Sequence, residues 1–150
     1  MKKLLLLLVF ALLIFSVGWR NDTEKESLDK IQWEHNLDSA FNLASNSNKI
    51  IMIDFMAEWC PPCKKMDKET FSNESVIQKL NEFILVRIDI DKQQNIAKEY
   101  NGNARKYGGI GVPNILFLDR EKSIVHRIVG FHNAGQLIAV MDSVLIKSYE

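Results

Sequence analysis

The stretch Trp-Cys-Pro-Pro-Cys-Lys at residues 59–64 decides how this chain folds. It follows an apolar run at residues 50–55 that predicts a buried strand. It leads into residues 64–69, which contain no β-branched residue and predict a helix. Two cysteines separated by two residues, where a strand turns into a helix, are typical of a redox site. Because Cys60 and Cys63 are the 2 cysteines of the sequence, both thiols belong to this one place.

The spacing of Cys60 and Cys63 suits a pair of thiols that forms a disulfide reversibly. In the first turn of a helix, residues i and i+3 share a face, so their sulfurs can form a small disulfide ring. Cys60 would lie at the helix start, where free N–H groups and the helix dipole stabilise a thiolate. Cys63, one turn further, would be less exposed and act as the resolving thiol. Pro61 and Pro62 fit the first turn but remove amides that could solvate the thiolate, so we expect a reducing rather than an oxidising potential.

Zinc binding and a purely structural disulfide are the two other uses of such a cysteine pair. A structural zinc site needs two more ligands at workable spacing. The remaining candidates, His35, His126 and His132, are scattered along the chain without a knuckle pattern. The prolines also withhold the amides that zinc knuckles turn toward sulfur. The sequence therefore favours redox activity over both alternatives.

The chain has the composition of one globular domain preceded by a leader. It has 150 residues, of which 47% are hydrophobic and 25% charged. Lys2 and Lys3 precede an uncharged run at residues 4–17, which is shorter than the ~20 residues of a membrane span. Small residues permit cleavage after Gly18. We therefore expect a signal peptide, or an uncleaved N-terminal anchor, at residues 1–18, a flexible tether at 19–27 and the folded domain at 28–150.

Charge and the leader together indicate where the protein acts. The sequence has 19 Lys and Arg against 19 Asp and Glu, with no basic patch that would favour nucleic acid. Export would place the dithiol outside the reducing cytosol, in the periplasm or the extracellular space, with the N-terminal segment as a membrane anchor if it is not cleaved.

Hydrophobic periodicity predicts alternating helices and strands along the rest of the chain. The expected helices lie at residues 37–44, from the cysteine pair to about 70, at 74–80 after an Asn73 N-cap, at 91–100 and, as the last helix, after Gly130. The expected strands lie at residues 50–55, 83–90, 114–118 and 123–129. Strands joined through helices pair in parallel, whereas the last two form an antiparallel hairpin. These elements predict an α/β fold, a central mixed β-sheet with helices on both faces.

Several segments carry a family resemblance. Residues 54–64 resemble the active-site signature of the thioredoxin superfamily, residues 111–113 its cis-proline loop and residues 129–131 its entry to the final helix. Residues 68–76 are similar to one branch, the thioredoxin-like domain at the C-terminus of the bacterial transmembrane thiol:disulfide interchange protein and its stand-alone relatives. The resemblance spans about residues 33–147 and implies a thioredoxin-like fold.

The resemblance implies a role for each matching residue. Cys60 would be the attacking thiol and Cys63 the resolving thiol. Trp59 would form a wall of the site and help to present it to a partner. Pro113, in cis, would lie against the disulfide and shape the peptide-docking groove, where Val112 would offer its backbone to a bound strand.

Asp54 is a further candidate for a catalytic residue. Burying a carboxylate inside an apolar strand costs free energy unless the group is paired or protonated. Burial should raise its pKa. Asp54 matches the family's buried acid, placed to relay a proton to or from Cys63. The alternative is a structural pair with Arg87 on the neighbouring strand. Thioredoxins often carry lysine there, and an arginine, which stays charged, could hold Asp54 ionised and weaken the relay.

The sequence thus predicts an exported, monomeric thiol–disulfide oxidoreductase that reduces disulfides of extracytoplasmic client proteins. It implies no cofactor and no nucleic-acid partner, but it requires an electron-donating dithiol protein, such as a membrane shuttle. A disulfide oxidase or isomerase, a non-redox binding or holdase module and a metal carrier remain open as alternatives.

Overall fold

The computed structural model describes residues 31–148, so the leader expected at residues 1–18 and the tether expected at 19–27 lie outside the described residues. The elements follow in the order α3 (Leu37–Ser47), β1 (Ile51–Met56), α4 (Pro61–Glu69), α5 (Glu74–Leu80), β2 (Ile84–Asp89), α6 (Gln94–Glu99), the 3-10 helix η1 (Arg105–Tyr107), β3 (Asn114–Leu118), β4 (Ile124–Val129) and α7 (Ala134–Ser148).

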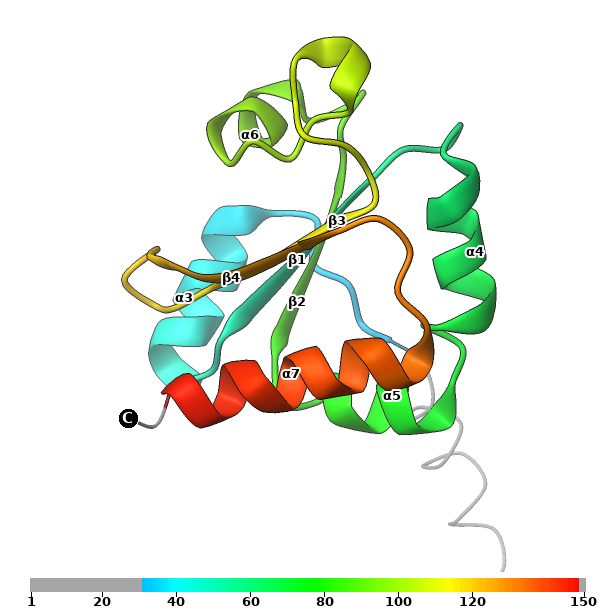
Figure 1. Ribbon diagram of the computed structural model, residues 1–150. Coiled ribbons are helices and arrows are strands. Elements are labelled where there is room, and N and C mark those ends of the chain that lie inside the picture. The colour runs from blue at the N-terminus through cyan, green and yellow to red at the C-terminus, as the bar shows by residue number, and fades with distance from the viewer. Residues whose placement is uncertain (1–30, 149–150) are drawn as a thin grey trace, which may run out of the picture. The chain divides into compact units, whose positions relative to one another are not determined.

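Four strands form one mixed sheet in the order β2-β1-β3-β4 (Figure 1). β1 pairs with β2 in parallel and with β3 antiparallel, and β3 pairs with β4 antiparallel. The helices lie on both faces of this sheet. The predicted α/β fold is therefore confirmed, and its register places Asp54 of β1 directly beside Arg87 of β2.

Successive residues of the central strand β1 point into two different apolar cores, one on each face of the sheet. Ile51, Ile53 and Phe55 belong to the core that contains α3, whereas Met52 belongs to the core formed with α4, α5 and α7. All four side chains are fully buried. A strand covered on both faces needs apolar residues at every position, which explains the uninterrupted run. Asp54 is the one ionisable side chain of β1, and alternation places it on the α4 side.

Two helix boundaries differ from the prediction for local reasons. The first helix continues through residues 45–47, where the hydroxyls of Ser45 and Ser47 donate to carbonyls one turn earlier. It ends at Asn48, which has a left-handed backbone conformation. The helix expected at residues 91–100 begins at Gln94, because the Asp89 side chain accepts the N–H of Asp91 and holds that stretch in a turn.

Residues 100–113, called here the α6–β3 loop, run from α6 through η1 to the Val112–Pro113 peptide bond, which is cis. Glycine allows this loop to lie against the core. A Cβ atom on Gly102 would be 2.4 Å from the Phe55 ring. Arg127 of β4 holds the start of the loop by donating to the carbonyls of Tyr100 and Asn101. The loop is thus tied to the sheet at the end where β1 leads into α4.

We expect Gly102→Ala to destabilise the protein, because the added methyl group overlaps the Phe55 ring. Overpacking of this kind costs about 1–3 kcal/mol. The free energy of unfolding measured in urea checks the prediction. Gly135→Ala is the matched control, since the nearest atom to its added Cβ, Asn133 Oδ1, is 3.7 Å away. Equal urea midpoints for Gly102→Ala and the unchanged chain would contradict it.

Candidate active site

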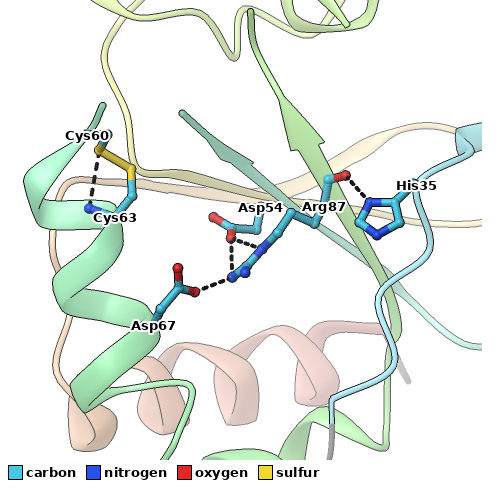
Figure 2. Close-up of polar contacts among 6 residues, drawn as sticks. All are labelled: His35, Asp54, Cys60, Cys63, Asp67 and Arg87. Atoms are coloured by element: carbon cyan, nitrogen blue, oxygen red, sulfur yellow. Dashed lines mark hydrogen bonds and ion pairs between the residues drawn. A yellow bond between two sulfur atoms is a disulfide. The ribbon is translucent and has the colours of Figure 1, made fainter. Parts of the chain in front are cut away.

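The two cysteines are joined by a disulfide at the N-terminus of α4 (Figure 2). Cys60 is the N-cap, and Pro61 and Pro62 occupy the first two helical positions. The first amide of the helix that can donate is therefore that of Cys63, and it donates to Cys60 Sγ over 3.2 Å. An N-cap side chain normally accepts such a bond, so the disulfide sulfur of Cys60 takes the place of a capping oxygen.

The expectation that Cys63 would be the less exposed cysteine is wrong. Cys60 is 1% exposed and Cys63 is 3% exposed. Both belong to the apolar core on the α3 side, together with Ala57 and Ala104, and Val112 packs against that core. The turn around the disulfide is itself open, since Trp59 is 44% exposed.

Trp59 is held by Asp91, in the turn after β2, and by residues of the α6–β3 loop. Its indole N–H donates to Asp91 Oδ2 over 2.5 Å, and the Tyr107 hydroxyl donates to Asp91 Oδ1 over 2.8 Å. The Lys106 ammonium lies 3.7 Å from the centre of the Trp59 ring. The bonds from Tyr107 and Trp59 hold the pKa of Asp91 below its ordinary value. The sequence did not predict these contacts of Trp59 with Asp91 and Lys106, because no sequence pattern links positions so far apart.

Val112 and Pro113 lie at the end of the α6–β3 loop, just before β3. Pro113 is buried and Val112 is partly buried. The carbonyl of Pro113 accepts the N–H of Gly130, which fixes the loop against the end of β4. The Val112 backbone makes no hydrogen bond to another residue of the described part of the chain.

Asp54 is buried beside Arg87, in the pairing considered as the alternative to proton relay. Arg87 Nε donates to Asp54 Oδ2 over 2.9 Å. The same guanidinium donates through Nη2 to Asp67 Oδ1 of α4 over 2.7 Å. Figure 2 shows Arg87 between the two carboxylates, on the side of the sheet where α4 carries the disulfide. The arginine thus links β1, β2 and the dithiol helix.

Two aromatic rings complete the surroundings of Arg87. Its guanidinium lies 4.3 Å from the centre of the Trp33 ring and 5.3 Å from that of Phe71. A planar, weakly hydrated cation suits such a site. Sequence reasoning identified Arg87 but neither Asp67 nor the two rings.

Burial raises the pKa of Asp54 to about 6, although the charge and the hydrogen bond of Arg87 oppose the rise. Asp67 adds a smaller contribution in the same direction as burial. The rise expected from the sequence is confirmed, and it coexists with the ion pair. A carboxyl group of this kind exchanges a proton close to neutral pH.

No three His, Cys, Asp or Glu side chains within residues 31–148 lie together in a way that could hold a metal ion. In the same part of the chain, no helix is long and apolar enough to cross a membrane.

The fold and the dithiol are those of a thiol–disulfide oxidoreductase of the thioredoxin type. A family model described as the thioredoxin-like domain matches residues 37–145. This chain belongs to that family.

Similar proteins include the thiol:disulfide interchange protein DsbD of Campylobacter jejuni, which is 32% identical over 96 residues, or 64% of this chain. The DsbD proteins of Actinobacillus pleuropneumoniae and Haemophilus influenzae are also 32% identical, over 98 and 94 residues. In each case the match covers 16% of the relative, so this chain corresponds to a small part of those proteins.

Solved structures share the fold at lower sequence identity. A thioredoxin from Thermus thermophilus has a TM-score of 0.64 at 22% identity, with 79% of this chain and 89% of that chain covered. The oxidised C-terminal domain of Neisseria meningitidis DsbD has a TM-score of 0.58 at 21% identity, with 75% and 98% covered.

We expect Asp54→Asn to stabilise the oxidised protein at pH 7 and to do so much less at pH 4. The pKa of Asp54 is raised from 3.8 to about 6, so the folded state holds its proton more tightly than the unfolded state. The stability that this proton confers is present below pH 4 and is lost as the pH rises to 6. A rise of about 2 units corresponds to about 3 kcal/mol at most.

Urea unfolding at the two pH values measures this difference. Asp38→Asn, which removes an exposed carboxylate in the first turn of α3, is the matched control. A stability gain for Asp54→Asn that is the same at pH 4 and pH 7 would show that Asp54 is not the buried titrating group.

Proposed function

We propose that this chain reduces disulfides of proteins outside the cytoplasm. The observation that carries the proposal is the Cys60–Cys63 bond at the start of α4, within a thioredoxin fold, beside an open Val112 backbone. A structural staple would be expected to join distant segments, whereas this bond closes a ring of four residues.

The proposed reaction transfers two electrons from the dithiol to a client. In the reduced protein, the Cys60 thiolate attacks one sulfur of the client disulfide, and the client's other sulfur leaves and takes up a proton. Cys63 then loses its proton and attacks Cys60 Sγ. This second step re-forms the Cys60–Cys63 disulfide and releases the second client thiol. In this proposal the client segment approaches Cys60 along the surface next to Trp59, which is exposed, and Val112.

Asp54 is the proposed acceptor of the Cys63 proton, directly or through water. A base is most effective when its pKa lies near the working pH, and burial moves Asp54 in that direction. Arg87 has the opposite effect, because its charge favours the carboxylate. In this proposal Cys60, Cys63 and Asp54 carry the chemistry, whereas Trp59, Val112 and Pro113 bind the client.

The proposed organisation is a leader at residues 1–18, a tether at 19–27 and the catalytic domain at 28–150. The leader would deliver the domain to the periplasm or the cell exterior, either free or anchored. The DsbD relatives carry thiol:disulfide interchange in their names, which supports an electron-donating dithiol protein as the partner that reduces this chain again. The protein acts as a monomer in this proposal and needs no cofactor.

We expect Cys63→Ser to accumulate a mixed disulfide between Cys60 and a disulfide-bearing client, because the resolving thiol is missing. Mass spectrometry under non-reducing conditions detects the adduct. Cys60→Ser is the matched control and should form none by this route. The absence of any adduct with Cys63→Ser would favour a non-redox binding module instead.

We expect the potential of the Cys60–Cys63 couple to lie nearer to about −270 mV than to about −120 mV, because Pro61 and Pro62 leave the thiolate few amides. Equilibration with reduced and oxidised glutathione, with the disulfide fraction read by mass spectrometry, measures it. A value near the upper figure would assign the protein to disulfide oxidases.

A further inference from the structure

An open groove of about 470 Å³ lies beside the dithiol. Its apolar lining includes Trp59 from the turn before α4, Ile110 and Val112 from the α6–β3 loop, and Val129 from the end of β4. Trp59, Ile110 and Val129 are each more than one-third exposed. Large apolar side chains exposed together on a small domain indicate a contact surface.

The charged residues that line this groove are all cations. They are Arg105 and Lys106, both exposed, and no Asp or Glu of the described chain is among the lining residues. An apolar groove with positive charge on one side favours a ligand with negative charge at a matching position.

Lys106 and Arg105 differ in what they already contact. The Lys106 ammonium rests against the rings of Trp59 and Tyr107, and its charge acts on Asp91. Arg105, in contrast, makes one long hydrogen bond, from Nε to the carbonyl of Ile110 over 3.5 Å. It has no carboxylate partner among the described residues. Its remaining N–H groups are therefore free to form the two-pronged contact that guanidinium makes with carboxylate.

The neighbouring backbone leaves room for such a contact. Gly111 has a φ of +126°, and a Cβ atom there would lie 3.9 Å from Arg105 Nε and 3.5 Å from Val129 Cγ1. Glycine thus keeps a side chain out of the space between Arg105 and the apolar lining.

We propose that this groove selects clients by charge: it binds an extended client segment that carries Glu or Asp within a few residues of its disulfide cysteine, with that carboxylate bonded to Arg105. The inference rests on the proposed reductase function and adds the class of substrate. The client strand lies along Val112, its apolar side chains contact Ile110 and Val129, and its acidic side chain reaches Arg105. Client segments rich in Lys or Arg bind less well because they meet Arg105 and Lys106 with like charge.

The test uses the full chain, reduced beforehand, in single turnovers with three synthetic peptides. Each peptide carries one cysteine in a mixed disulfide with mercaptoethanol, and the two residues on either side of that cysteine are Glu, Gln or Lys. Every turnover oxidises the Cys60–Cys63 dithiol and reduces one peptide disulfide. At an ionic strength of about 10 mM we expect the Glu peptide to react roughly tenfold faster than the Lys peptide. The ratio should fall toward one in about 1 M salt.

Two variants assign the effect to the groove. Arg105→Gln should bring the Glu-to-Lys rate ratio to within about threefold of one. Arg120→Gln is the matched control, because Arg120 follows β3 at the far end from Pro113, and it should keep the original ratio. The neutral bis(2-hydroxyethyl) disulfide is measured in parallel for each protein.

The outcomes separate the two proposals. Failure of the unchanged protein to reduce the neutral disulfide would overturn the reductase function. Reduction of that compound with equal rates for the three peptides would overturn only the charge selection and leave apolar contact as the basis of recognition. A Glu-to-Lys ratio that survives Arg105→Gln would also overturn it, since the selectivity would then come from elsewhere.

Discussion

The burial of β1 on both faces is the constraint on which the site depends. A strand at the centre of the sheet, packed against α3 on one side and against α4, α5 and α7 on the other, has no freedom to shift along its neighbours. A shift by one residue would exchange the two faces and bring Asp54 into the apolar core next to α3. Because only three residues separate the end of β1 from Cys60, this packing also fixes where Cys60 and Cys63 lie.

Burial of the Asp54 carboxylate costs free energy, and the charge of Arg87 offsets only part of that cost. Taking an ionised group out of water is unfavourable, and an arginine that binds two carboxylates compensates for part of that penalty. The outcome is a raised pKa despite a direct ion pair. The two interpretations of Asp54 offered by the sequence, a proton carrier and a structural partner of Arg87, are therefore compatible. A group can be held in place by an ion pair and still titrate near neutral pH.

The sequence was informative wherever function and fold depend on neighbouring residues. The strand-to-helix turn at residues 59–64, the Asn73 N-cap and the hairpin of β3 and β4 are all local patterns, and the structure contains each of them. The pairing of Asp54 with Arg87 could also be foreseen, because it follows from two adjacent parallel strands. The contact between Arg87 and Asp67 could not be foreseen, since it depends on how α4 packs across the sheet. The same holds for the α6–β3 loop, whose path depends on contacts such as Gly102 against Phe55 and Arg127 with Tyr100 and Asn101.

The two prolines in the first turn of α4 leave Cys60 with a single amide donor, that of Cys63. The backbone around the Cys60 sulfur therefore lacks the N–H groups that residues other than proline would supply there. An ordinary residue at position 62 would restore a second donor at the mouth of the helix without altering either sulfur. Within this scaffold, a position that carries no sulfur thus decides how many backbone N–H groups the Cys60 sulfur can accept.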